Sequence, residues 1–186
     1  YEGMVQNMSC KIYMDHAATT EMLPQVRKAM EPYLMEEYGN ASTSYEMGRR
    51  TREALEGARE QIAMLIKAKP EEIFFTSGGS ESDNWVIKNV AAEKKEKGKH
   101  VITSKIEHHA VLRSCEYLEK LGYELTYLDV DAYGVIDLAQ LREILREDTT
   151  LVSVMTGNNE IGTIEPLDAV ASMLLSLIHI SEPTRH

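Results

Sequence analysis

The sequence has few cysteines, prolines and glycines, and it lacks a long apolar run. Its two cysteines, Cys10 and Cys115, are too few for a disulfide framework in 186 residues and suit a reducing compartment. Five prolines and 11 glycines exclude a collagen-like or low-complexity chain. The longest apolar run, Met173–Ile180, is interrupted by Ser176 and His179, whereas a membrane-spanning helix needs about 20 apolar residues. We therefore expect a globular protein without a membrane partner.

Positive charge is also scarce. The chain carries 20 Lys and Arg against 30 Asp and Glu, a net charge of −10 at pH 7, which repels nucleic acids and anionic membranes. The densest cationic stretch, residues 94–100, contains Glu96 and is typical of the solvated end of a helix. Residues 1–11 lack the apolar segment of a signal peptide. These features predict a cytoplasmic protein that does not bind nucleic acid directly.

Strand-like and helix-like patterns alternate through most of the chain. Short runs rich in β-branched or aromatic residues predict strands at Glu72–Thr76, His100–Ser104, Tyr123–Leu128 and Thr150–Met155. Helical periodicity predicts helices at residues 80–97, 108–121 and 138–145, after two earlier helices at 24–38 and 45–67. Gly122 closes one helix as a left-handed residue would. This alternation is typical of an α/β protein with a mostly parallel sheet that is covered on both faces.

The segment Thr76–Asn84 is a candidate anion site. A predicted strand runs into Gly78 and Gly79 and then into a helix, whose first N–H groups and positive dipole end favour an anion. The Ser80 hydroxyl can cap the helix or bind a phosphate oxygen. No lysine follows the glycines, so the segment is not a Walker loop, and their spacing does not fit the dinucleotide fingerprint. A tight turn with a capped helix is as compatible with these residues as a phosphate site.

Two further polar segments follow predicted strands, at the carboxyl edge where ligands of open α/β sheets bind. The first contains Lys105, His108 and His109, and an imidazole there can stack on a ring, move protons, or simply cap a helix. Adjacent histidines on a helix point to different faces, so a metal site is not expected. The second segment, Thr156–Thr163, includes the pair Asn158 and Asn159, which suits either a turn or hydrogen bonds to a ligand.

Five ordered segments resemble the group I, NifS/IscS-like cysteine desulfurases of the class V aminotransferase superfamily. The resemblance extends from about Ile12 to about Val170. The matching segments are Tyr13–Thr20, Tyr38–Ser42, Phe75–Asn84, Lys105–Leu112 and Asn158–Gly162.

This resemblance implies the N-terminal part of a fold-type-I domain that uses pyridoxal 5′-phosphate. Gly79 and Ser80 match the positions that hold the cofactor phosphate. His108 matches the histidine that stacks on the cofactor ring and shuttles protons, and Asn159 matches the asparagine that contacts its phenolic oxygen. Two of the matching segments, at residues 15–20 and 39–42, border the substrate pocket in the family. No metal is expected.

The family converts L-cysteine to L-alanine and leaves a persulfide on an enzyme cysteine, for iron–sulfur cluster assembly or tRNA thiolation. The resemblance therefore also implies a sulfur-acceptor or scaffold protein as partner, and a homodimer for the full-length protein. The family's Schiff-base lysine, its pyridine-binding aspartate and the persulfide cysteine fall beyond this chain. Cys115 lies on the apolar stripe of its helix, which predicts a core residue. We expect no turnover and poor folding from the 186 residues alone.

Other interpretations remain open at this point. Another class V enzyme, such as a selenocysteine lyase or an aminotransferase, would share these motifs, and a non-catalytic phosphate-binding remnant would share the glycine turn. For domain organisation, we expect residues 1–11 to be an overhang or start and residues 12–174 to be the family domain. Residues 175–186 form a non-native tail in this interpretation, because codons for Leu175–Arg185 can be written as a sequence that resembles a transposase-type sequencing adapter.

Overall fold

The computed structural model describes the backbone of residues 12–181 and the side chains of residues 12–175. The chain divides into two compact units, residues 1–75 and residues 76–186, and each is described by itself. The interpretation of residues 1–11 as an overhang, and Cys10 with it, lies outside the described residues. So does the end of the predicted tail at residues 182–186.

The first unit is helical over its described part. Helix α1 spans Pro24–Met35, helix α2 spans Glu46–Ile66, and a single 3₁₀ turn, η1, spans Pro70–Glu72. Helix α2 ends at Lys67, which adopts the left-handed conformation with φ 58°. The apolar stripe of α2 is exposed in this unit, with Leu65 82% accessible to solvent.

The strand predicted at Glu72–Thr76 is absent. Glu72 belongs to η1 and residues 73–76 have no regular secondary structure, so this prediction is wrong. The β propensity of Phe74 and Phe75 reflects how such side chains pack on a pleated surface, and it does not supply a neighbouring strand. Both rings are exposed, and the guanidinium of Arg59 lies 5.0 Å from the centre of the Phe75 ring.

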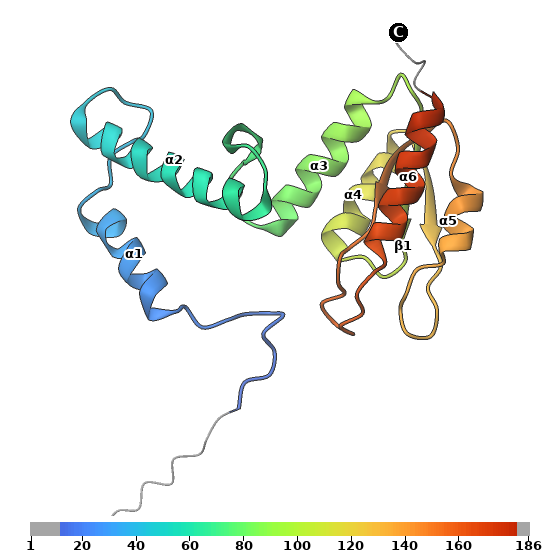
Figure 1. Cartoon of the computed structure of the whole chain (residues 1–186), viewed down its shortest axis with the longest axis horizontal. Coiled ribbons are helices and arrows are strands. Elements are labelled where there is room, and N and C mark those ends of the chain that lie inside the picture. The colour runs from blue at the N-terminus through green and yellow to red at the C-terminus, as the bar shows by residue number, and fades with distance from the viewer. Residues whose placement is uncertain (1–11, 182–186) are drawn as a thin grey trace, which may run out of the picture. The chain divides into compact units, whose positions relative to one another are not determined.

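The second unit is an α/β structure around a parallel sheet, as predicted. Strand β1 lies between the other two in the order β2-β1-β3, and both pairings are parallel (Figure 1). The elements in chain order are α3 Gly79–Glu93, β1 His100–Ser104, α4 His109–Lys120, β2 Glu124–Leu128, α5 Leu138–Ile144, β3 Thr149–Ser153 and α6 Leu167–Ser181. Gly122 follows α4 with φ 83°, which confirms the predicted left-handed residue. Helix α3 ends earlier than predicted, and the lysine-rich residues after it form turns.

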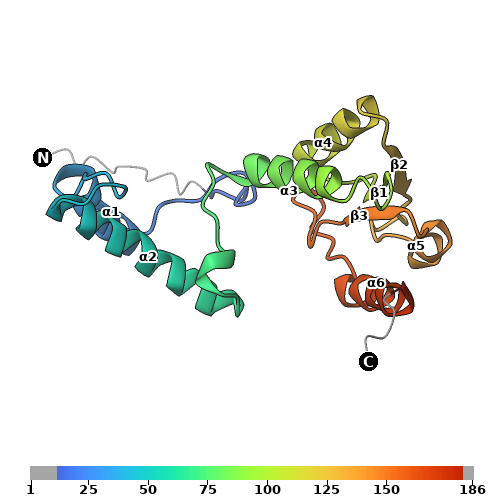
Figure 2. The ribbon, with the colours of Figure 1, turned by 90° about the horizontal axis from the view of Figure 1, so that it is seen from above.

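Successive residues of β1 face two separate cores, because side chains alternate along a strand. Val101 packs with Ile87 of α3 and Cys115 of α4 on one face of the sheet. Ile102 packs with Leu141 of α5 on the other face, together with residues of β2 and α6. Figure 2 shows the resulting layers, with α3 and α4 on one side of the strands and α5 and α6 on the other. The sheet is therefore covered on both faces.

Helix α6 continues from Leu167 to Ser181 and so includes the first part of the predicted tail. The helical backbone of α6 does not test whether these residues come from an adapter sequence. The non-native origin of residues 175–186 therefore stays a prediction. Within residues 12–181, none of the helices has both the length and the apolar character that crossing a bilayer requires.

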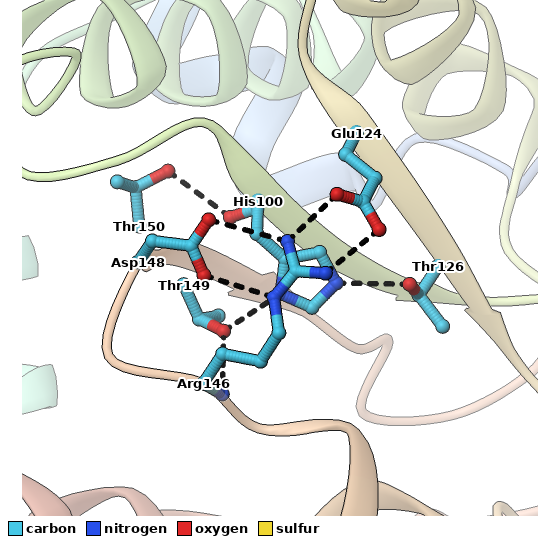
Figure 3. A network of polar contacts seen from close by, with 7 residues as sticks. All are labelled: His100, Glu124, Thr126, Arg146, Asp148, Thr149 and Thr150. Carbon is cyan, nitrogen blue, oxygen red and sulfur yellow. Dashed lines mark hydrogen bonds and ion pairs between the residues drawn. The ribbon is translucent and has the colours of Figure 1, made fainter.

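A polar network joins the amino ends of the three strands (Figure 3). The His100 ring is 1% exposed, and its nitrogens lie 2.7 Å from Thr149 Oγ1 and 2.8 Å from Thr126 Oγ1. In the same network, the Arg146 guanidinium donates two hydrogen bonds to Glu124, at 2.7 and 2.9 Å, and two to Asp148. The network thus connects residues at the start of β1, β2 and β3.

We predict that the second unit becomes less stable as the pH is lowered, because of His100. Burial, and secondarily the charge of Arg146, lowers the pKa of His100 below its usual 6.5, although Glu124 and Asp148 partly oppose this. Just below pH 6.5 the unfolded chain therefore binds more protons than the folded chain, so acidification lowers the free energy of unfolding. Urea unfolding of the full-length protein at pH 7.5 and pH 5.5 should show this loss, and its His100→Gln variant should show a smaller one. An equal loss in both proteins would contradict the prediction.

Candidate functional site

The carboxyl ends of β1 and β3 bring two of the predicted polar segments together. The two strands are parallel neighbours whose last paired residues are Thr103 and Ser153, and the Thr103 hydroxyl donates to the Ser153 carbonyl at 3.0 Å. The loop with His108 follows β1, and the loop with Asn158 and Asn159 follows β3. Both loops therefore leave the sheet at the same edge.

The glycine turn begins helix α3 at Gly79. The N–H groups of Gly79 and Ser80 belong to the first helical turn, where no helix carbonyl precedes them. A Cβ atom built at Gly78 or at Gly79 would meet no other atom within 4 Å, so open space lies in front of both glycines. Ser80 is exposed beside them. The turn therefore offers free donors and room for an anion such as a phosphate group.

Glu81, which was not among the predicted site residues, closes this turn. Its carboxylate accepts hydrogen bonds from the Ser77 N–H at 2.6 Å and from the Ser77 hydroxyl at 2.7 Å. Both bonds lower the pKa of Glu81, and the bond from the Ser77 hydroxyl contributes most. In the capping box, Ser/Thr-x-x-Glu/Gln, a glutamate reaches back over the first helical turn, and this pattern can be recognised in a sequence. The Ser-x-x-x-Glu spacing here is a variant of it. Ser80 lies inside α3, whose N-cap residue is Gly78, so its hydroxyl does not cap the helix.

His108 is the N-cap residue of α4. Its Nδ1 accepts a hydrogen bond from the Ala110 N–H at 3.1 Å, and the side chain is exposed. Because Nδ1 acts as an acceptor, the neutral ring carries its proton on Nε2. The helix cap therefore fixes the ring's tautomer and orientation and leaves Nε2 as the nitrogen that can exchange a proton with a ligand.

Of the two adjacent asparagines, Asn158 is the structural one. Its Nδ2 donates to the Ile106 carbonyl at 2.9 Å, and its Oδ1 accepts from the N–H groups of Glu160 at 2.8 Å and Ile161 at 3.0 Å. Asn158 thus pins its own turn to the loop before α4. Asn159 is exposed on that turn, in a position to contact a ligand.

Glu107 is buried between the same two loops and was not predicted. It is 6% exposed, and its Oε1 accepts from the Met155 N–H at 2.6 Å and from the Ser104 hydroxyl at 3.2 Å. Burial raises the pKa of Glu107, the two hydrogen bonds lower it, and the nearby carboxylates of Asp83 and Glu165 raise it. Since Asp83 lies in α3, the start of that helix is within electrostatic reach of this edge of the sheet.

The remaining candidates have structural partners or lie in the other unit. Lys105 forms an ion pair with Asp129, which also accepts from Gln140 at 3.0 Å, so Lys105 has a surface role. Cys115 is fully buried, as predicted, and burial raises its pKa to about 11. The predicted pocket segments 15–20 and 39–42 belong to the first unit, whereas this site is built from the second. Among residues 12–175, no cluster of acidic, histidine or cysteine side chains suits a metal ion.

Comparisons with known proteins cover most of this chain. The aminotransferase class-V family model matches residues 12–177. A cysteine desulfurase IscS of Dictyoglomus turgidum is 54% identical over 166 residues, which are 89% of this chain and 42% of that protein. A solved NifS-like protein superposes with a TM-score of 0.87 at 39% identity, covering 89% of this chain and 45% of its own. A structure described as SspA in complex with cysteine superposes with a TM-score of 0.85 at 37% identity, covering 89% of this chain and 48% of its own. The chain spans less than half the length of these relatives.

We predict that the two asparagines differ sharply in their effect on stability. Asn158→Ala removes three hydrogen bonds and leaves the Ile106 carbonyl and two N–H groups without these partners, so it should cost about 1–3 kcal/mol. Asn159→Ala, at the exposed neighbour, should change the free energy of unfolding by about 0.5 kcal/mol or less. Urea denaturation of both variants of the full-length protein checks this. Equal losses would show that Asn158 does not hold the turn.

Proposed function

Because the chain belongs to the class-V aminotransferase family, we propose that it is the N-terminal part of a cysteine desulfurase. The observation that carries the proposal is the shared edge of β1 and β3, where His108 and Asn159 project from two loops joined by hydrogen bonds. The 54% identity to a cysteine desulfurase IscS supports this choice within the family. The substrate in this proposal is L-cysteine, and one of the structural relatives is described as a complex with cysteine.

The cofactor in this proposal is pyridoxal 5′-phosphate, and the residues present fit it. Gly79 and Ser80 would hold its phosphate, since the first turn of α3 has free donors and open space in front of the glycines. His108 would lie against the ring and Asn159 would donate to the phenolic oxygen. When bound, this cofactor supplies an electron sink for bonds broken on the amino acid.

The chain's own residues bind, orient and exchange protons in this reaction. The α3 turn anchors the anion, and His108 holds a proton at Nε2 while the Ala110 N–H bond to Nδ1 keeps the ring in place. Overall, the carbon–sulfur bond of cysteine breaks, a sulfur–sulfur bond forms on an enzyme thiol, and alanine leaves with the thiol proton. The enzyme cysteine and the cofactor-binding lysine would come from the part of the protein that follows this chain.

The further partners belong to the proposal as well. A persulfide on the enzyme is useful only when an acceptor takes the sulfur, so we include a sulfur-acceptor or scaffold protein that serves iron–sulfur cluster assembly or tRNA thiolation. We also include a homodimer of the full-length protein in the cytoplasm. The net charge of −10 supports the absence of a direct nucleic-acid partner.

The phosphate contact can be tested at Ser80. We expect Ser80→Ala to weaken binding of pyridoxal 5′-phosphate to the apoprotein about tenfold, because one hydrogen bond to a charged group contributes about 1.5 kcal/mol. Ser80→Thr keeps the hydroxyl and should retain the affinity. Equilibrium dialysis with pyridoxal 5′-phosphate and with pyridoxal measures both, and pyridoxal should not distinguish the variants. The same loss with both ligands would mean that Ser80 does not bind the phosphate.

The activity requires the complete reading frame. Reading the source gene past the codon for Leu174 should reveal the lysine and cysteine segments of the family. The product of that frame, incubated with L-cysteine, should form L-alanine in amounts equal to the sulfur that a thiol reductant releases. The 186-residue chain alone should form none. A stop codon directly after His186, or a complete protein that forms no alanine from cysteine, would overturn the proposal.

A further inference from the structure

We propose that Glu107 is a positioning residue whose buried carboxylate holds the loop of His108 and the loop of Asn159 in a fixed relation. This inference rests on the proposed function for the roles of His108 and Asn159. The hydrogen bonds that Glu107 accepts come from Ser104 and Met155, so it acts on His108 and Asn159 through the backbone that carries them.

The first step is where the sheet stops. Pairing between β1 and β3 ends at Thr103 and Ser153, so the ladder no longer joins these two strands beyond those residues. Buried or half-buried N–H groups need an acceptor. Met155, two residues past β3, donates its N–H to Glu107 Oε1 at 2.6 Å. The carboxylate thus continues the connection between the two strands after the ladder ends.

The second step is that the same oxygen also contacts β1. The Ser104 hydroxyl, at the last residue of β1, donates to Glu107 Oε1 at 3.2 Å. One carboxylate oxygen therefore joins the end of β1, the start of α4 and the exit of β3. A parallel connection lies next to it, where Asn158 Nδ2 donates to the Ile106 carbonyl at 2.9 Å. Two bonds between the loops fix their relative position better than one.

The third step is the placement of the exposed residues. Ile106 and Glu107 directly precede His108, and Asn158 directly precedes Asn159. Glu107 is buried and Ile106 and Asn158 are half-buried. His108 and Asn159, in contrast, are exposed. A site residue is held accurately when the residues that support it are locked by packing and hydrogen bonds. Glu107 provides that support to both sides of the site at once.

The fourth step is the burial of a charge-bearing group. Burying a carboxyl group is unfavourable unless hydrogen bonds compensate. Glu107 is 6% exposed, and Asp83 and Glu165 add two further negative charges nearby. An apolar side chain would avoid this cost, but it could not accept the Met155 N–H. The acceptor oxygen is therefore the property of Glu107 that the site uses, and glutamine shares it.

The experiment compares four variants in the product of the complete reading frame. Glu107→Ala removes the acceptor, and Glu107→Gln keeps it. Glu119→Ala removes an exposed glutamate of α4, the helix that follows Glu107, and Leu141→Ala destabilises the core that Ile102 and Leu141 share. Amide hydrogen exchange is followed at Met155, and affinity for pyridoxal 5′-phosphate is measured on the folded apoproteins.

We expect Glu107→Ala to speed exchange at Met155 about tenfold beyond the change in Leu141→Ala, and to weaken cofactor binding about tenfold. Glu107→Gln should restore both quantities to within about threefold of the parent, and Glu119→Ala should leave both unchanged. A Glu107→Ala protein that matches Leu141→Ala in both readouts would overturn the proposal, because its effect would then be loss of stability alone.

Two results separate this inference from the proposed function. If the parent protein does not bind pyridoxal 5′-phosphate, the proposed function fails. Amide hydrogen exchange at Met155 then still tests whether Glu107 holds the loop after β3. If Glu107→Ala does not accumulate as folded protein, Glu107→Asp takes its place, because its carboxylate is one methylene too short for the same reach. Exchange at Met155 as slow in Glu107→Asp as in the parent would then overturn the proposal.

Discussion

The position of β1 between two parallel neighbours is the constraint on which the rest of the second unit depends. Because both edges of β1 are paired, its side chains can only point to the two faces of the sheet, and Val101 and Ile102 do so in turn. Each face then requires its own helical cover, which α3 and α4 provide on one side and α5 and α6 on the other. The parallel direction places the ends of all three strands at a common edge.

At that edge, side chains take over from the backbone ladder. Glu107 and Asn158 each bind a backbone group of the opposite loop, so hydrogen bonds join two loops that have no regular structure. This arrangement resolves a conflict between order and access. A ligand-binding residue must be exposed, yet its backbone must be fixed. Here Glu107 is buried beside the exposed His108, and Asn158 is half-buried beside the exposed Asn159.

The sequence predicted the parallel α/β unit, because hydrophobic periodicity and turn residues such as Gly122 are local signals. It failed at Glu72–Thr76, where propensity alone suggested a strand and no partner strand is present in the described sheet. The family pattern proposed His108 and Asn159 as site residues, whereas sequence reasoning assigned Glu107 no role and left Asn158 open between a turn and a ligand contact. Those two act across 48 and 52 residues of chain, and no local pattern distinguishes a buried glutamate from a solvated one. Asn158 and Asn159 are chemically identical, so only the three-dimensional contacts separate their roles.

The Arg146 network lies at the amino ends of the strands, whereas the candidate residues His108 and Asn159 lie in loops that follow the carboxyl ends. The contacts that tie β1, β2 and β3 together through His100 and Arg146 share no residue with the loops of His108 and Asn159. Substitutions in the loops can therefore accumulate without loosening that network. Such a division lets natural selection vary the chemistry of one end while the other end remains unchanged, and it gives a physical basis for the many reactions that related sheets support.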